Sequence, residues 1–73
     1  MTAKLRQLTG RELIVILRNH GFQIDRQSGS HVIMIHIDGR RVTIPVHAGR
    51  TLGKGLLRSI MNDARLTRED LET

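Results

Sequence analysis

The feature that most constrains the fold is a pair of strand-like segments on either side of Asp38-Gly39. Residues 31–37 read HVIMIHI, a short apolar run, and residues 40–46 read RRVTIPV, which alternates apolar and polar side chains. Both patterns are typical of strands, and Asp-Gly is a strong signal for a two-residue hairpin turn. The sequence therefore predicts an antiparallel hairpin. The apolar residues of its second strand share one face and are Val42, Ile44 and Val46.

A third strand is expected before this hairpin. Residues 22–26 read FQIDR, which alternates apolar and polar side chains, and QSGS at 27–30 supplies turn residues. The three segments together predict a three-stranded antiparallel meander. Pro45 cannot donate a hydrogen bond to a neighbouring strand, so we expect its strand at the sheet edge.

One helix is expected before the meander in the sequence and another after it. Thr9 and Glu12 form a T-x-x-E capping box, which predicts a helix over about residues 10–20 that ends at Gly21. Leu5 and Leu8 precede this cap and could fold against the first helical turn. Helical spacing of apolar residues predicts a second helix from residue 52 or 54 to 64. Thr67 and Asp70 then suggest a short last turn of helix.

This order favours an α+β fold, a two-layer α-β-β-β-α sandwich with both helices on one face of the sheet. The 73 residues contain no repeat or linker, so we interpret residues 1–73 as a single domain. No cysteine is present, which excludes disulfides and thiolate zinc sites. The absence of a long apolar run or of a secretory pattern leads us to expect a cytoplasmic protein without membrane insertion.

The charge is positive and unevenly distributed. The net charge is +5, and residues 1–60 carry ten bases and three acids, whereas residues 61–73 carry two bases and four acids. Ten of the twelve bases are Arg, whose forked guanidinium suits phosphate. This composition indicates a polyanionic partner such as RNA, although an ordinary solvated basic surface is the alternative.

His31 is the first candidate for chemistry because it opens a strand directly after Ser28-Gly29-Ser30. Ile33, Ile35 and Ile37 look like the buried face, which would include His31 unless it lies at the exposed strand end. A structural histidine is the alternative. The opposite face carries Val32, Met34 and His36, which is apolar enough to predict a cover: a second copy, the N-terminal tail or a dedicated protein partner.

Basic residues recur at a spacing of four around the start of the second helix. Arg50, Lys54 and Arg58 would line one stripe wherever that segment is helical, near the amides of a helix N-terminus. We interpret the stripe as a phosphate site, with a solvated helix face as the alternative. A zinc site made by His31, His36 and His47 is disfavoured, because neighbouring odd and even strand positions point to opposite faces.

Four segments taken together resemble the HicA family of toxin mRNA interferases. They are Gly21-Phe22, GSH at 29–31, DGRRVTIPVHAGR at 38–50 and KGLLRSI at 54–60, in that order along nearly the whole chain. The resemblance implies a fold like that of double-stranded RNA-binding domains, a ribonuclease whose catalytic histidine is His31, and a HicB-type antitoxin as partner. His47 also matches a family position and is given a supporting role. Met34 departs from the aromatic residue that relatives often carry there.

The resulting hypothesis is a cofactor-free and metal-independent endoribonuclease. RNA supplies its own nucleophile, the 2′-hydroxyl, and a histidine can transfer the proton near neutral pH. The expected RNA contacts are Arg26, Ser30, Arg50, Lys54 and Arg58, and the expected antitoxin contacts are Val32, Met34 and His36. Two alternatives remain: a non-catalytic RNA-binding module that uses the basic stripe, and an interaction protein whose charge is incidental.

Overall fold

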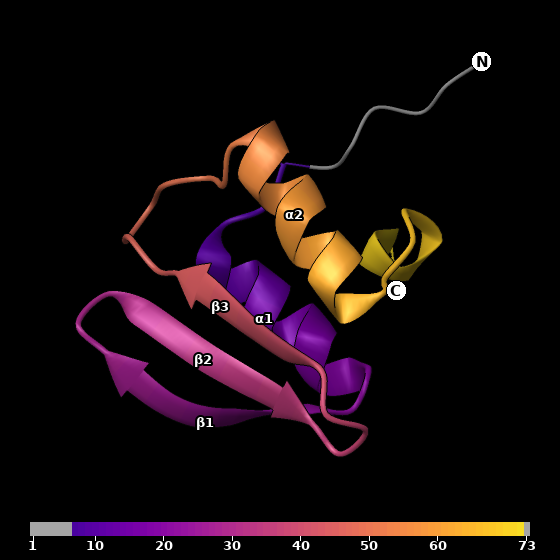
Figure 1. Ribbon diagram of the computed structural model, residues 1–73. Coiled ribbons are helices and arrows are strands. Elements are labelled where there is room, and N and C mark those ends of the chain that lie inside the picture. The colour runs from indigo at the N-terminus through magenta and orange to yellow at the C-terminus, as the bar shows by residue number, and fades with distance from the viewer. Residues whose placement is uncertain (1–6, 73) are drawn as a thin grey trace.

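The computed structural model describes residues 7–72 and contains the elements in the expected order. Along the chain, the three strands follow the first helix and precede the second, and a short 3-10 helix comes last (Figure 1). Their bounds are α1 Gly10–Asn19, β1 Phe22–Ser28, β2 His31–His36, β3 Arg41–Pro45, α2 Lys54–Ala64 and η1 Glu69–Glu72. The predicted α-β-β-β-α order is confirmed, and β1 is two residues longer than expected.

Helix α1 begins and ends where its caps predict. The Thr9 hydroxyl accepts from the Glu12 amide at 3.2 Å, and the Glu12 carboxylate accepts from the Thr9 amide at 2.9 Å. The helix stops before Gly21, whose φ of 92° lies in the left-handed region that glycine tolerates. Leu8, directly before the cap, is fully buried. The predicted contact of Leu5 falls outside the described residues.

The sheet is an antiparallel meander with β2 in the centre. β3 lies at an edge, as Pro45 predicted. The β2–β3 hairpin, however, is not closed by a two-residue turn at Asp38-Gly39. The His36 amide donates to the Arg40 carbonyl at 2.9 Å, so that three residues, 37 to 39, form the loop. Gly39 supplies the positive φ, 100°, that such three-residue loops require.

This loop length determines which face of β2 is buried. Met34 lies opposite Val42, and Val32 lies opposite Ile44, so the apolar residues of β3 meet the even positions of β2. Val32 and Met34 are 4% and 0% exposed, whereas Ile37 is 99% exposed. The expectation that the odd positions face the core is therefore wrong. A register change of one residue turns every side chain to the other face, and the three-residue loop makes that change.

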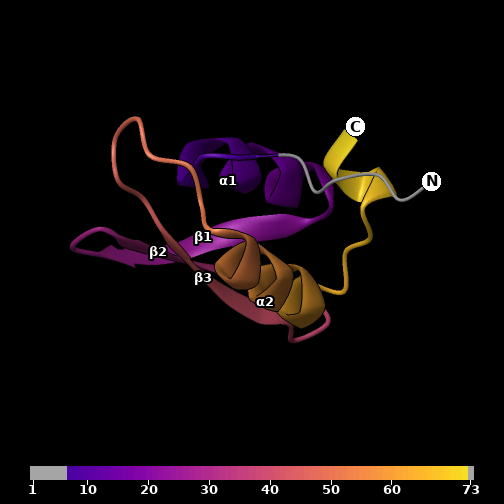
Figure 2. The same ribbon diagram turned by 90° about the horizontal axis from the view of Figure 1, so that it is seen from above.

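Both helices pack on the even face of the sheet. α1 contacts β1 and β3, and α2 contacts β3, so that one apolar cluster joins the helices to that face. Viewed from above, neither helix covers the opposite side of the three strands (Figure 2). We call this uncovered side the open face. The register places on it Gln23, Arg26 and Ser28 from β1, His31, Ile33 and Ile35 from β2, and Arg41, Thr43 and Pro45 from β3.

The C-terminal segment returns to α1. α2 ends at Arg65, which has a left-handed φ of 57°. The Asp70 carboxylate then accepts from the Thr67 amide at 2.7 Å, which confirms the predicted cap before η1. His20 at the end of α1 joins the two parts, because its Nε2 lies 3.4 Å from Asp70 Oδ1. No helix in residues 7–72 is long and apolar enough to cross a membrane.

Candidate functional site

His31 is an exposed side chain on the open face. It is the first residue of β2 and lies opposite Ser28 of β1 and Pro45 of β3. Because the odd positions of β2 face away from the helices, the histidine points out of the core without needing a special position at the strand end. Solvent and a bound molecule therefore have access to its ring.

An irregularity in β1 brings Arg26 to the same face. Ile24 pairs with Met34 and Arg26 pairs with Ile33, so Asp25 is an extra residue in the ladder. Strict alternation from Phe22 and Ile24 would have turned Arg26 toward the helices. The bulge shifts the rest of the strand by one residue and places Arg26 diagonally from His31. Nothing in the strand pattern indicated this shift.

The loop between β3 and α2, residues 46–53, lies beside His31. The Val46 amide donates to the Ser30 carbonyl at 2.6 Å, so the ladder between the two segments continues for one residue beyond β3. The loop is held at its other end, where the Leu52 amide donates to the Leu8 carbonyl at 2.6 Å. The part of the chain that carries His47 is thus fixed next to the turn that precedes His31.

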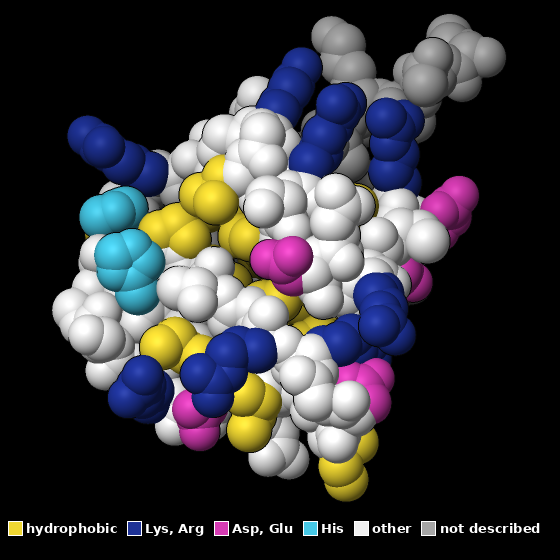
Figure 3. Space-filling model, viewed as in Figure 1, with side chains coloured by type: hydrophobic (Ala, Val, Ile, Leu, Met, Phe, Trp, Pro, Cys, Tyr) yellow, Lys and Arg dark blue, Asp and Glu magenta, His cyan; other side chains and the backbone are white. Residues whose placement is uncertain are grey.

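A hollow of about 260 Å³ opens within this loop. It is lined by Pro45, His47, Arg50, Thr51, Leu52, Gly53 and Leu56. Lys54, the first residue of α2, follows directly and is exposed. The space-filling view shows two histidine side chains on this side of the molecule, with Lys and Arg side chains around them (Figure 3). The hollow combines cations that could hold phosphate with an apolar floor that could contact a base or a ribose.

The structure brings together most, but not all, of the predicted RNA contacts. Arg26 and Ser30 lie beside His31, and Arg50 lines the hollow with His47. Lys54 follows the hollow as the first residue of α2. Arg50 lies in the loop, so only Lys54 and Arg58 share the face of α2. Arg58 lines a different cavity of about 150 Å³ with Met61, Asn62, Leu66 and Arg68. The predicted stripe is therefore divided, and its last member lies apart from the histidines.

The predicted antitoxin contacts lie on the face of the sheet that the helices cover, and not on the open face. Val32 and Met34 are core residues. His36 is half-buried, with its ring 5.1 Å from that of Phe22. The half-buried isoleucines of the open face, Ile33 and Ile35, are the ones accessible to a partner. Met34 packs in the core, so a side chain at this position cannot stack on a base.

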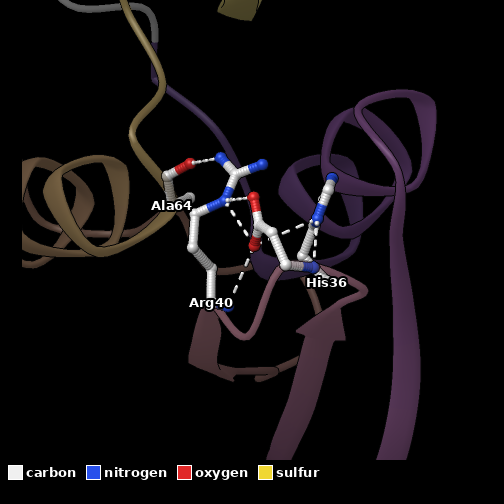
Figure 4. A network of polar contacts seen from close by, with 4 residues as sticks. His36, Arg40 and Ala64 are labelled. Carbon is white, nitrogen blue, oxygen red and sulfur yellow. Dashed lines mark hydrogen bonds and ion pairs between the residues drawn. The ribbon is translucent and has the colours of Figure 1, made fainter.

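His36 belongs instead to a polar network at the far end of the hairpin (Figure 4). Its Nδ1 accepts from the Asp38 amide at 3.1 Å, and Arg40 donates through Nε to the Asp38 carboxylate at 2.9 Å. The hydrogen bond from the Arg40 side chain is the main cause that lowers the pKa of Asp38 from 3.8 to about 2. Arg40 also donates to the Ala64 carbonyl at the end of α2. His36 therefore stabilises the hairpin and does not belong to the group of residues around His31.

The histidines do not assemble a metal site. His31 and His47 lie at one end of the sheet, and His36 lies at the other end on the opposite face. Within residues 7–72, no group of three or more His, Asp or Glu side chains is placed to hold a metal ion. The arrangement around His31 instead offers two imidazoles near the guanidinium groups of Arg26 and Arg50, which suits proton transfer beside a phosphate.

Comparison with known proteins gives a family for the chain. No curated protein sequence matches the chain. The family model described as the HicA toxin of bacterial toxin-antitoxin matches residues 10–66, which span all five main elements and both exposed histidines. The match covers most of the chain, and the protein therefore belongs to the HicA toxin family of bacterial toxin-antitoxin systems.

Proposed function

We propose that this HicA toxin is an endoribonuclease that cleaves mRNA and uses His31 to transfer a proton. The observation that carries the proposal is the exposed position of His31 on the open face, diagonal to Arg26. Imidazole can accept or donate a proton near neutral pH. A guanidinium nearby can stabilise the negative charge that develops on a phosphate during cleavage.

The basic residues around His31 define the proposed path of the RNA. Arg26 lies on the open face, and Arg50 and Lys54 lie at the loop and at the start of α2. Ser30, half-buried in the turn before β2, lies between these two groups. Contacts from both sides would hold the backbone at the histidine. Arg58, further along α2, would contact RNA only beyond this point.

The reaction needs no cofactor because RNA contains its own nucleophile. The 2′-hydroxyl attacks the adjacent phosphorus after losing its proton, and the 5′-oxygen of the next nucleotide leaves. The protein supplies a proton acceptor, a proton donor and positive charge. The products are a 2′,3′-cyclic phosphate and a 5′-hydroxyl. Since mRNA is the proposed substrate, we place the protein in the cytoplasm.

We propose a HicB-type antitoxin as the partner that covers the open face. Ile33 and Ile35 form an apolar strip on the only side of the described sheet that lacks a helix, and Arg26 and Arg41 flank it. A protein that buries this strip would also cover His31, which is on the same strand and face. Inhibition would then be steric.

A non-catalytic RNA-binding module is the second candidate, because Arg50, Lys54 and Arg58 are all exposed. Electrostatic binding through Arg50, Lys54 and Arg58 would require no histidine. Such a protein would bind RNA with a strong dependence on salt concentration and would leave it intact. Loss of RNA cleavage on changing His31 distinguishes the two functions.

The first experiment measures cleavage of a long unstructured RNA by the purified protein in excess EDTA. His31→Ala is compared with wild type and with His20→Gln, which removes a histidine outside the site, and circular dichroism checks that all are folded. We expect cleavage to fall by about 10²-fold or more in His31→Ala alone, in the range of general acid–base catalysis. We also expect wild-type products to end in a 2′,3′-cyclic phosphate.

Three outcomes would contradict the proposal. Equal cleavage by wild type and His31→Ala would remove His31 from the mechanism. Loss of all cleavage in EDTA, with 3′-hydroxyl products when metal is restored, would indicate a metal-activated water. Salt-dependent binding without any cleavage would support the RNA-binding module.

A further inference from the structure

We infer that His47 is a second catalytic residue, which exchanges protons with the substrate on the side of the scissile phosphate opposite to His31. The inference rests on the proposed ribonuclease function and goes beyond a supporting role for this residue. It starts from the ladder between the β1–β2 turn and the segment after β3. That ladder places the two histidines at the same end of the sheet.

The register fixes their relative position. His31 lies opposite Pro45, and the hydrogen bond from the Val46 amide to the Ser30 carbonyl continues the pairing by one step. His47 follows Val46 directly and so stands at the position that is diagonal to His31 when this ladder is extended by one more residue. Diagonal neighbours have Cα atoms about 7 to 8 Å apart. This spacing leaves room for one phosphate between two imidazole rings.

Both rings have access to a bound phosphodiester. His31 is exposed on the open face, and His47 is exposed and lines the hollow of about 260 Å³ with Arg50 and Leu56. A phosphate between the histidines would direct one attached nucleoside toward the open face and the other toward the hollow. In-line displacement needs this arrangement, because the attacking and leaving oxygens lie on opposite sides of phosphorus.

The charges around the two histidines favour this use. Arg26 lies diagonal to His31 on the open face, and Arg50 lines the hollow together with His47. Asp25, the acid of β1, has its carboxylate 3.7 Å from Arg41, toward the other end of the sheet. Arg26 and Arg50 can therefore hold the phosphate while the histidines remain available to exchange protons.

The proton balance requires two groups in opposite states. The neutral histidine takes the proton of the 2′-hydroxyl as the bond from O2′ to phosphorus forms. The protonated histidine gives its proton to the 5′-oxygen as the bond from phosphorus to O5′ breaks. Each ring ends in the state from which the other began. No redox partner or metal ion takes part.

The test uses a substrate whose leaving group needs no proton. In a dinucleotide with sulfur in place of the bridging 5′-oxygen, a thiolate leaves without general acid catalysis. We compare His31→Ala and His47→Ala on this substrate and on the matching oxygen substrate, with His20→Gln as control. Both site variants should lose about 10²-fold or more with oxygen. One of them, and not the other, should recover with sulfur.

A second measurement is the dependence of the cleavage rate on pH, whose shape does not depend on small differences in stability between the variants. The rate of wild type should pass through a maximum with pH, because one histidine must be neutral and the other protonated. Each single variant should lose one side of this profile. His47→Gln, which keeps a polar side chain, should behave as His47→Ala does.

The outcomes separate this inference from the function on which it rests. If wild type does not cleave RNA, the ribonuclease proposal fails. If wild type cleaves and only His31→Ala is inactive, the role of His47 is wrong while the ribonuclease proposal stands. Recovery of both variants with sulfur, or of neither, would likewise show that His47 does not exchange a proton in the reaction.

Discussion

Arg40 is the residue that joins most parts of the fold. Its guanidinium carbon lies 5.1 Å from the centre of the Phe22 ring, its Nε donates to Asp38, and it bonds the Ala64 carbonyl at the end of α2. Only 19% of its side chain is exposed. The sequence places Arg41 directly beside it, but that side chain is 60% exposed, and its guanidinium lies 3.7 Å from the Asp25 carboxylate.

We expect Arg40→Ala to lower the free energy of unfolding by about 2 kcal/mol, because partners of a charged hydrogen-bond donor would be left unsatisfied. Arg41→Ala should change it by less than about 0.5 kcal/mol, as is usual for exposed pairs. Urea unfolding followed by circular dichroism measures both variants. Equal effects of the two substitutions would mean that the hairpin network does not stabilise α2.

Asp38 should make the same network sensitive to acid. Its folded pKa of about 2 is below the ordinary value of 3.8, so ionised Asp38 stabilises the fold above pH 4. This contribution should disappear as the pH falls from about 4 to 2. We expect the urea midpoints of wild type and Asp38→Asn to differ at pH 5 and to converge as the pH falls through 2, where folded Asp38 is half protonated. Asp70 is present in both proteins, so its own lowered pKa cancels in the comparison.

Among the secondary-structure elements, each of the two helices has a glycine in its first turn, and the two glycines differ in their surroundings. Gly10 opens α1 where the helix approaches the end of β3, and a Cβ built on it would overlap the Pro45 carbonyl oxygen. Gly55 lies in the first turn of α2, and a Cβ built there meets no atom within 4 Å. The first glycine permits close packing beside the proposed site, whereas the second only lowers the helix propensity.

We therefore expect opposite effects from the same substitution. Gly10→Ala should destabilise the protein by about 1 to 3 kcal/mol, the range of an overpacked contact, because backbone must move. Gly55→Ala should stabilise it by about 0.5 to 1 kcal/mol. Thermal and urea unfolding of both variants provide the comparison. A neutral Gly10→Ala would show that α1 and β3 can separate without cost.

At the scale of the whole molecule, the sheet has one face covered by helices and one open face. Met34 belongs to the first, and Ile35, its neighbour in β2, belongs to the second. Adjacent residues of similar chemistry therefore have different functions. One stabilises the fold, and the other is available to the proposed antitoxin.

Two substitutions separate these functions. We expect Ile35→Glu to remain folded and to lose about 10²-fold or more of its affinity for the cognate HicB-type antitoxin, because a buried charge would face the partner. Val15→Glu, at an exposed position on α1, should leave binding unchanged. Met34→Ala should instead cost about 2 to 5 kcal/mol of stability. Titration calorimetry and urea unfolding measure the two quantities, and unchanged binding by folded Ile35→Glu would overturn the proposed interface.

The sequence alone determined the order of the elements and the caps that bound them. Capping boxes, turn glycines and the spacing of apolar residues act over a few neighbouring positions, so Thr9, Gly21 and Thr67 carry this information locally. The family segments likewise indicate His31 as the candidate for catalysis. The face of the sheet on which His31 lies could not be determined from the sequence pattern, because both faces of β2 are apolar and alternation does not distinguish them.

Tertiary structure decided the faces and the composition of the candidate site. A three-residue hairpin loop, in place of a two-residue turn, set the register that buries Met34 and exposes His31. A bulge at Asp25 moved Arg26 to the open face, and a ladder bond beyond β3 fixed His47 beside His31. Each of these features depends on which backbone groups of distant segments pair with one another. Pairing across strands follows from the packing of both helices against one face of the sheet, which no single segment of the sequence specifies.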